Sequence, residues 1–349
     1  MGENPRSRDE LRYLQSLPLD LKIAMTKQRL RGWINTYGID GVYVSFSGGK
    51  DSTVLLHMAR SMYPDIKAVF VDTGLEYTEL RRFVGKFDNV DVIRPKMSFR
   101  QVCEKYGFPI ISKEISEAVY EARRYIKGEN DKCHLSRYEK LTGRGIWSEG
   151  ERRSQYSGKR WSFFLDAPFD LSDKCCRVMK KAPSHSYEDK TGRKCITAQM
   201  TSESRMREMQ WLRNGCNGFN MKRPKSNPMA FWYEQDVLEY IQKYGIEIAS
   251  VYGDIVVDYE AMNEMDGQMM LDDEDWMYPL RTTGCQRTGC ILCGYGCHLD
   301  RGESRFERLK RTHPNAHKAL NVISNSGVTY AQALDWINEH NGKGQIIRY

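Results

Sequence analysis

The chain has 349 residues, of which 40% are hydrophobic and 28% charged, and its formal net charge at pH 7 is +7. A chain of this length buries about three-quarters of its unfolded surface, so folding requires neither disulfides nor a bound metal. No apolar run approaches the roughly 20 residues of a membrane span, and Met1–Pro5 do not begin an apolar signal core. We therefore expect a cytoplasmic protein with no membrane partner.

Short apolar runs alternate with helical patterns along the chain. A helical lead-in is expected at residues 8–38. Strand patterns follow at 42–44, 67–71, 90–93 and 194–200. Helical patterns lie between or after them at 53–59, 76–87, 99–106 and 114–128. This alternation predicts an α/β fold with a doubly wound parallel sheet.

The charge is spread unevenly along the chain. Residues 123–194 hold 18 Lys and Arg against 10 Asp and Glu, whereas residues 253–276 hold nine acidic residues and no Lys or Arg. We expect three parts, which are a lead-in at 1–38, a nucleotide-binding domain at 39–245 with a basic insertion at about 128–170, and a third part at 246–349. The third part contains the acidic segment, a cysteine cluster and C-terminal helices.

The basic insertion is expected to be irregular between Gly128 and Trp161. Its Arg and Lys residues are interleaved with Trp147, Tyr156 and Trp161, a mixture that can grip a nucleic-acid backbone and stack bases. A solvated loop anchored by its tryptophans explains the same residues. We favour the loop slightly, because no nucleic-acid-binding signature accompanies the mixture.

The glycine-rich segment Ser45–Ser52, Ser-Phe-Ser-Gly-Gly-Lys-Asp-Ser, joins the first apolar strand to a helix. Such a junction directs backbone N–H groups and the positive end of a helix at an anion. Glycines at 48 and 49 let a phosphate approach the backbone, serines at 47 and 52 add hydroxyl donors, and Lys50 adds a charge. A glycine turn that only links strand to helix is the weaker interpretation.

Two later segments also follow expected strands. Asp72 ends one strand, where a carboxylate can meet a ribose or adenine or can cap the next helix. The segment Thr201–Arg207 follows another strand and has the composition of an anion-binding turn or of a capping box. We favour anion binding, since this turn would face the same crevice as the glycine-rich segment.

The cysteines suggest a metal centre. Ten cysteines in a cytosolic protein are more often reduced, metal-bound or catalytic than paired. Four crowd into thirteen residues, and a Cys-x-x-Cys flanked by glycines is a strong metal signal. These four are Cys285, Cys290, Cys293 and Cys297. The adjacent pair Cys175 and Cys176 is weak evidence alone, because free cysteine is often a small buried hydrophobe.

Several of these motifs resemble those of one family. Ser-Gly-Gly-Lys-Asp-Ser resembles the PP-loop of ATP pyrophosphatases, which cleave ATP between its α and β phosphates, and not the Walker A loop. Together with Asp72-Thr73-Gly74, Glu203-Ser204-x-x-Arg207 and Pro228-Met229-x-x-Trp232, it is similar to successive motifs of the phosphoadenosine-phosphosulfate (PAPS) reductase family. The resemblance spans roughly residues 21–325 and implies the PP-loop, or adenine nucleotide alpha hydrolase-like, α/β fold.

The resemblance also implies site residues and cofactors. The cofactors would be ATP with Mg²⁺ and a [4Fe–4S] cluster. The catalytic residues would be Lys50, Asp51 and Arg207. The nucleotide would be bound by Ser45, Ser47, Gly48, Gly49, Lys50, Asp51, Ser52, Asp72, Thr73, Gly74, Glu203 and Ser204.

The cluster ligands implied by the resemblance follow the adenylyl-sulfate (APS) reductase arrangement, a Cys-Cys pair plus a distant Cys-x-x-Cys. They are Cys175, Cys176, Cys290 and Cys293. The alternative set, for iron–sulfur or zinc, is Cys285, Cys290, Cys293 and Cys297, with His298 as a substitute ligand. The remaining cysteines, expected to be ordinary buried thiols, are Cys103, Cys133, Cys195 and Cys216.

Two departures separate this sequence from the reductases that it resembles. Reductases carry a nucleophilic cysteine in a C-terminal Glu-Cys-Gly-Leu-His segment, whereas this sequence has no cysteine after Cys297. Reductases also alter the glycine loop, because their substrate has sulfate where ATP has its β and γ phosphates. Both departures favour the ATP pyrophosphatase branch, which includes enzymes of DNA phosphorothioation and of tRNA thiolation.

The leading hypothesis is therefore an enzyme that adenylates an acceptor, releases pyrophosphate and lets sulfur displace AMP. Its partners would be an adenine nucleotide and a sulfur donor, either sulfide or a cysteine desulfurase. One rival is an APS or PAPS reductase in which Cys285 or Cys297 supplies the nucleophile. Another is a non-catalytic nucleotide-binding partner module. Homo-oligomerisation and the identity of the acceptor are left open.

Overall fold

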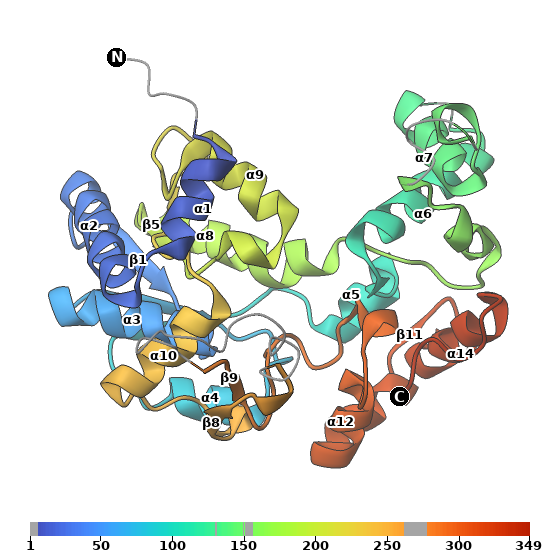
Figure 1. The fold of residues 1–349 in the computed structure, drawn as a ribbon. Coiled ribbons are helices and arrows are strands. Elements are labelled where there is room, and N and C mark those ends of the chain that lie inside the picture. The colour runs from blue at the N-terminus through green and yellow to red at the C-terminus, as the bar shows by residue number, and fades with distance from the viewer. Residues whose placement is uncertain (1–5, 130, 149, 151–155, 262–277) are drawn as a thin grey trace. The chain divides into compact units, whose positions relative to one another are not determined.

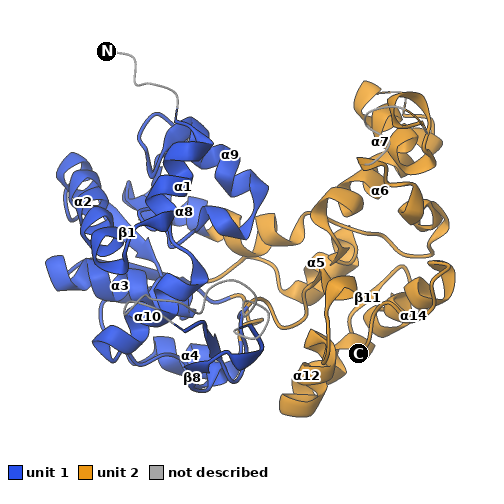
Figure 2. Ribbon diagram, viewed as in Figure 1, with its two compact units in different colours: residues 1–72, 77–93, 184–288 blue, residues 73–76, 94–183, 289–349 orange. Residues whose placement is uncertain are grey.

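The computed structural model describes residues 6–129, 131–148, 150, 156–261 and 278–349. Its contacts divide the chain into two compact units, coloured separately in Figure 2. Unit 1 comprises residues 1–72, 77–93 and 184–288, and unit 2 comprises 73–76, 94–183 and 289–349. This division crosses the expected boundaries at 39 and 246, which stay predictions. Most of the acidic segment lies outside the described residues.

Unit 1 is built on a six-stranded sheet with the order β3-β2-β1-β5-β7-β6. All neighbouring strands are parallel except the pair β6 and β7. The strands are β1 (Val42–Ser45), β2 (Ala68–Val71), β3 (Val90–Ile93), β5 (Lys194–Ile196), β6 (Asn217–Gly218) and β7 (Lys225–Ser226). The chain runs outward from β1 to β3 and then continues on the other side of β1 at β5. The order in which strands are added therefore reverses between the parallel neighbours β1 and β5, and this position is the topological switch point of the sheet.

The central strands are apolar because both faces of the sheet are covered. Val42, Tyr43 and Val44 are at most 1% exposed, and the first three residues of β2 are also buried. Continuous apolar runs of this kind are typical of parallel sheets between helical layers. The expected α/β fold with a mostly parallel, doubly wound sheet is thus confirmed.

Helices surround this sheet (Figure 1). They are α1 (Arg8–Ser16), α2 (Leu19–Tyr37), α3 (Lys50–Met62), α4 (Thr78–Val84), α9 (Arg205–Asn214) and α10 (Glu234–Tyr244). The expected lead-in is therefore two helices, and α2 packs on both α3 and α10. Its residues Leu30 and Trp33 are completely buried. An antiparallel pair, β8 (Ile255–Val257) and β9 (Leu280–Thr282), completes the unit.

Unit 2 is mainly helical. Its principal helices are α5 (Phe99–Tyr106), α6 (Lys113–Ile126), α7 (Lys132–Thr142), α12 (Arg305–Thr312) and α14 (Tyr330–His340). Two-residue strands β4 (Ile110–Ile111) and β10 (Gly294–Tyr295) pair in parallel, and β11 (Ser324–Asn325) forms a hairpin with β12 (Val328–Thr329). The core contains a stacked pair, Phe108 and Tyr330, with ring centroids 4.8 Å apart. Among the described helices of the chain, none has both the length and the apolar character needed to cross a membrane.

The segment from Gly128 to Trp161 is more ordered than expected. Residues 132–142 form α7, which the Asp131 side chain caps at its start and Gly143 ends in the left-handed conformation. Its buried His134 faces Glu121 of α6, with 2.7 Å between Nδ1 and Oε2. The expectation of an irregular segment was wrong here. The face of α7 that packs on α6 is mostly polar, so the sequence lacks the apolar repeat by which a helix is usually recognised. Trp161 is 6% exposed, which agrees with an anchoring role.

Candidate functional site

The glycine-rich turn between β1 and α3 has the geometry of an anion site. Gly48 has φ +74°, and a Cβ there would lie 2.8 Å from Cγ2 of Val84, so only glycine fits. The hydroxyls of Ser47 and Ser52 lie 3.1 Å apart and fix the turn from within. Gly49 occupies the N-cap of α3 without a side-chain cap. The N-cap residue itself therefore leaves the start of the helix open to an anion.

Lys50 is buried and held by protein groups. Its ammonium donates to the carbonyl of Gln286 at 2.7 Å and lies 2.9 Å from Oε1 of Glu234. Its backbone N–H donates to the hydroxyl of Tyr252. The charge expected to meet phosphate is thus present, and Glu234 balances it.

Asp51 follows Lys50 in the first turn of α3. Burial raises the pKa of its carboxyl, and the Lys50 ammonium offsets part of this rise. Its Oδ1 lies 3.9 Å from that ammonium and has no hydrogen-bond partner among the described residues. A carboxylate oxygen without a partner is a suitable ligand for a hard cation such as Mg²⁺.

A second charged turn follows β5. Glu203 forms an ion pair with Arg207, and its other oxygen lies 3.9 Å from Nη2 of Arg287. Ser204 is the N-cap of α9 and accepts from the N–H of Arg207. The capping and charged interpretations of this turn are therefore compatible.

The two turns belong to one site because β1 and β5 are paired neighbours at the switch point. The charges confirm their proximity, since Asp51 interacts electrostatically with both Arg207 and Arg287. Burial and the nearby Arg287 lower the pKa of Arg207. Ligands of open α/β sheets bind in the crevice at this point. Unit 1 thus gathers three cations and three carboxylates around the start of α3.

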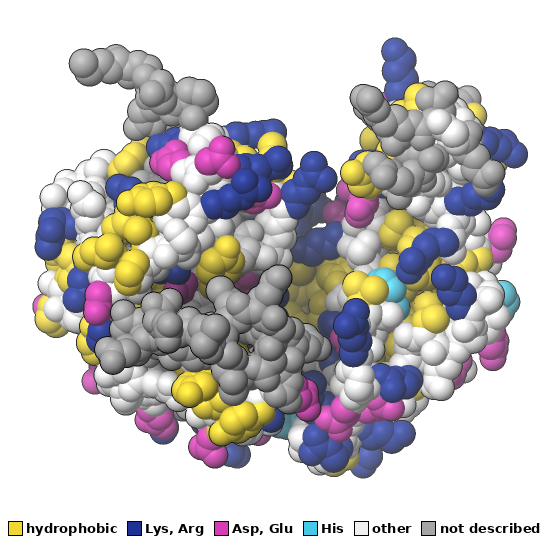
Figure 3. Space-filling model, viewed as in Figure 1, with side chains coloured by type: hydrophobic (Ala, Val, Ile, Leu, Met, Phe, Trp, Pro, Cys, Tyr) yellow, Lys and Arg dark blue, Asp and Glu magenta, His cyan; other side chains and the backbone are white. Residues whose placement is uncertain are grey.

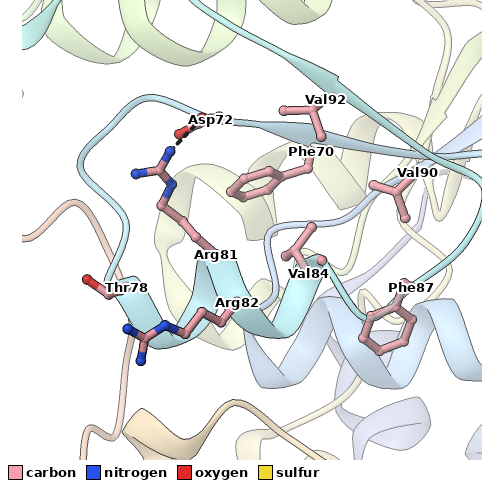
Figure 4. Close-up of a pocket in the computed structure, with 10 residues that line it drawn as sticks. Phe70, Asp72, Thr78, Arg81, Arg82, Val84, Phe87, Val90 and Val92 are labelled. Atoms are coloured by element: carbon pink, nitrogen blue, oxygen red, sulfur yellow. Dashed lines mark hydrogen bonds and ion pairs between the residues drawn. The ribbon is translucent and has the colours of Figure 1, made fainter.

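Asp72 is buried at the end of β2, where it forms a 3.0 Å ion pair with Arg81 of α4. Figure 4 shows the pair at the edge of a pocket of about 450 Å³ between α4 and the strands β2 and β3. Phe70, Val84 and Val92 supply apolar lining. The expected role of Asp72 at adenosine stays a prediction, and Arg81 neutralises its charge in this structure.

The next two residues of this motif, Thr73 and Gly74, belong to unit 2. Both the N–H and the hydroxyl of Thr73 donate to the carboxylate of Glu76, at 3.0 and 2.6 Å. Gly74 has φ +75° and no atom within 4 Å of an added Cβ. The turn is thus built around the Glu76 carboxylate.

Unit 2 brings four of the cysteines together. Burial raises the pKa of the Cys175 thiol, and the nearby thiols of Cys176, Cys290 and Cys293 raise it further. Burial likewise raises the pKa of Cys290 to about 11, although Lys180 partly opposes this effect. All four thiols are reduced. The two motifs, more than 100 residues apart, therefore meet in one place.

The described residues contain no group of three or more His, Cys, Asp or Glu side chains arranged to hold a single metal ion. Thiols around a multi-iron cluster lie at its corners and are farther apart than the ligands of one ion. Lys180, on a π-helical turn (Arg177–Lys181), interacts electrostatically with Cys176, Cys290 and Glu76. The donor set thus suits a cluster of four irons bound by four thiolates.

The alternative ligand set spans both units. Cys285 lies in unit 1, whereas Cys290, Cys293 and Cys297 lie in unit 2. His298 packs edge-on against Trp161, with centroids 5.2 Å apart, and burial lowers its pKa. The remaining cysteines, Cys103, Cys195 and Cys216, are buried as expected, but Cys133 is exposed. The expectation for Cys133 was wrong because it occupies the solvent-facing side of the first turn of α7.

Sequence comparison finds a related domain. Residues 41–163 match the family model of the phosphoadenosine phosphosulfate reductase domain. This part of the chain is thus similar to the PAPS reductase family. The matched residues begin just before β1 and include the glycine-rich turn.

Three relatives illustrate the similarity. The phosphoadenosine 5'-phosphosulfate reductase of Synechococcus sp. is 30% identical over 128 residues, which are 35% of this chain and 53% of that protein. The adenosine 5'-phosphosulfate reductase of Staphylococcus epidermidis is 25% identical over 158 residues, 44% of this chain and 61% of that protein. An uncharacterized protein of Methanocaldococcus jannaschii is 38% identical over 73 residues, 20% of this chain and 18% of that protein. The chain thus spans between half and two-thirds of the length of the two reductases.

A crystal structure of phosphoadenylyl-sulfate reductase from Candida auris, in complex with phosphate, is also similar. Its TM-score is 0.36 and its sequence identity is 15%, over 71% of this chain and 92% of that chain.

Three residues of the candidate site were missed in the sequence. Glu234 and Tyr252 bond to Lys50 from elements about 200 positions away, and no local pattern marks them. Arg287 lies between two cysteines that drew attention to metal binding. The one sequence signal for a role of Arg287 in the site was its position next to the Cys-x-x-Cys motif.

Proposed function

We propose that this protein is a PP-loop ATP pyrophosphatase that adenylates an acceptor for sulfur transfer and carries a [4Fe–4S] cluster. The observation that carries the proposal is the cluster of Lys50, Arg207 and Arg287 around the start of α3. A triphosphate has the charge to match three cations, and the loop keeps the complete Ser-Gly-Gly-Lys-Asp-Ser sequence.

The protein residues would act on the phosphates in the following way. The N–H groups at the start of α3 and the hydroxyls of Ser47 and Ser52 hold the β and γ phosphates. Lys50 exchanges Glu234 for a phosphate oxygen, and Arg207 exchanges Glu203. An acceptor oxygen attacks the α phosphorus, and the bond to the β-phosphate oxygen breaks. Fixed cations then stabilise charge that grows on the departing pyrophosphate.

Mg²⁺ would accompany ATP as part of the substrate. Asp51 fits this ion, since its Oδ1 is buried and has no hydrogen-bond partner among the described residues. Binding a cation there would favour the ionised carboxylate, which burial alone disfavours.

The four thiols of Cys175, Cys176, Cys290 and Cys293 would hold the cluster. Four cysteine ligands leave its irons without an open site, so it supplies structural or electrostatic support. Lys180 would neutralise part of the thiolate charge, in keeping with its electrostatic interaction with Cys176 and Cys290. In the second half of the reaction, sulfide would attack the acceptor atom that bears the adenylated oxygen, and AMP would leave with that oxygen. A cysteine desulfurase could supply the sulfur as a persulfide, in which case a reducing thiol would release it at the sulfide level.

A sulfonucleotide reductase is the second candidate, since the relatives from Synechococcus and Staphylococcus epidermidis are named as reductases. It requires an accessible thiolate as nucleophile. The two thiols considered for that role are 3% exposed at Cys285 and 2% at Cys297, and burial raises the pKa of Cys297 to about 12. These properties disfavour nucleophilic attack by either thiol.

The test is product analysis with the anaerobically purified full chain. ATP labelled at the α phosphate is incubated with Mg²⁺, sulfide and candidate acceptors, and AMP is quantified. We expect AMP formation and ATP–pyrophosphate exchange that Lys50→Ala abolishes and Lys86→Ala, at an exposed ion pair, preserves. Thioredoxin-dependent sulfite release from APS or PAPS without AMP formation would instead establish the reductase.

A further inference from the structure

A second cationic pocket lies in unit 1, on the surface where α1, α2 and the end of α9 meet β6. Its volume is about 410 Å³, and most of its lining is polar. Three guanidinium groups border it, from Arg6, Arg29 and Arg213, against the single carboxylate of Glu10. Figure 3 shows Lys and Arg side chains gathered over α1 and α9, with acidic side chains beside them. We call this site the arginine pocket.

The sequence at the end of α9 is adapted to this pocket. Gly215 has φ +67°, and a Cβ at this position would lie 2.6 Å from Nε of Arg6. Glycine therefore lets the guanidinium of Arg6 lie over the turn that ends the helix. Next to it, the buried Cys216 interacts electrostatically with Arg29 and Arg6.

Two of the guanidinium groups form no ion pair with a carboxylate of the described residues. Arg8 is paired with Glu208 and Arg12 with Asp9. Within the described part of the chain, Arg29 and Arg213 form no ion pair with a carboxylate. A pair of such arginines bordering a polar pocket suits a phosphate, whose oxygens accept two parallel N–H bonds from one guanidinium.

An exposed aromatic ring borders the same pocket. Phe219 is 40% exposed, yet its ring is held 5.0 Å from Trp33 and 6.2 Å from Tyr37, centroid to centroid. Trp33 is completely buried, so Phe219 is presented from a rigid base. A fixed, exposed ring beside guanidinium groups is the combination that binds a nucleobase and its phosphate.

We infer that the arginine pocket binds a nucleotide unit, with phosphate on Arg29 and Arg213 and the base stacked on Phe219. The nucleotide is either free or part of a single strand. This site is separate from the glycine-rich turn, and the inference stands whether or not the protein cleaves ATP. Helix α9 joins the two sites, since Arg207 lies in its first turn and Arg213 in its last. Six residues of α-helix correspond to about 9 Å, so a strand in this pocket would extend toward the crevice within one or two nucleotides.

The test is a titration of the full chain with fluorescein-labelled ten-nucleotide single-stranded DNA and RNA, followed by anisotropy at about 0.1 M salt. We expect the double variant Arg29→Ala/Arg213→Ala to weaken binding at least tenfold and to lower the salt slope by about 1.4, for two lost phosphate contacts. Phe219→Ala should weaken binding about fivefold or more. Circular dichroism confirms that each variant is folded.

Arg12→Ala is the matched control, since Arg12 lies on α1 but is absent from the pocket lining and is paired with Asp9. It should change affinity less than twofold. Unlabelled AMP and inorganic phosphate are added as competitors. If AMP displaces the labelled strand with an affinity equal to that of the strand, the ligand is a free nucleotide. If AMP displaces the strand only weakly, the ligand is a single strand. Equal binding by wild type and double variant, or equal loss in Arg12→Ala, overturns the inference.

Discussion

The phenol hydroxyl of Tyr295 donates a 2.6 Å hydrogen bond to the backbone carbonyl of Ser172. Tyr295 lies two residues after Cys293, and Ser172 lies three residues before Cys175. The bond therefore ties the Cys-x-x-Cys turn to the segment of the Cys-Cys pair. The parallel pairing of Tyr295 with Ile111 adds a second attachment of the same turn.

Removal of this hydroxyl in Tyr295→Phe should weaken the assembly of the four thiols. A neutral hydrogen bond contributes about 1 kcal/mol, so we expect iron binding about fivefold weaker and less iron and sulfide per chain after anaerobic purification. Tyr156→Phe alters an exposed tyrosine of the same unit and should leave the iron content unchanged. Full iron content in Tyr295→Phe would show that the two segments are held together without this bond.

Glu234→Gln should raise the affinity for ATP. Glu234 lies 2.9 Å from the Lys50 ammonium and would compete with phosphate for it. Removing an ion pair of this partly exposed kind changes the free energy by about 1 kcal/mol, so affinity should rise roughly threefold to fivefold by calorimetry. Glu247→Gln, at an exposed pair with Lys86, is the control. A lower affinity in Glu234→Gln would mean that Glu234 positions Lys50 and does not compete for it.

Gly48→Ala should destabilise the protein more than alanine at a comparable glycine. Both Gly48 and Gly245 have positive φ, but an added Cβ at Gly245 meets nothing within 4 Å. Backbone strain alone costs about 1 kcal/mol, and contact with Val84 should add about 1–2 kcal/mol at Gly48. Urea unfolding of the two variants measures the difference. Equal free energies of unfolding would contradict the close approach of α4 to the turn.

Stability should fall as pH rises through neutrality because of Glu239. Burial, together with the nearby Asp236, raises the pKa of Glu239 to about 7, and Lys22 opposes this rise. In the unfolded state the Glu239 carboxyl has a pKa of about 4.5 and releases its proton above that pH, whereas the folded state keeps the proton up to about pH 7. Stability is therefore lost as the pH rises from about 4.5 to about 7. From pH 5 to pH 8 the free energy of unfolding should decrease by about 1–3 kcal/mol.

Glu239→Gln isolates this contribution, because the amide keeps the shape of the protonated side chain and cannot ionise. Urea unfolding at pH 5 and pH 8 should show a smaller loss of stability in this variant than in the wild type. An unchanged difference between the two pH values would assign the effect to another group.

The sequence by itself determined the local features of this protein. The apolar run Val42–Val44, the glycines and the helical pattern after them specify strand, turn and helix within about 20 residues, so their positions were predicted closely. The same is true of β3 and α5, whose bounds match the expected ones. Local signals failed for α7, whose helical face is polar and is stabilised by packing on α6.

Only the tertiary structure decided which distant residues meet. The Glu234 and Tyr252 partners of Lys50 lie about 200 positions away, and the Ser172 carbonyl that Tyr295 reaches carries no sequence signal. The cysteine motifs could be recognised in the sequence. Their proximity in unit 2, however, depends on the pairing of β4 with β10 and on the hydrogen bond from Tyr295 to Ser172. Hydrophobic periodicity and turn chemistry act over a few residues, whereas ion pairs and strand order depend on how the whole chain packs.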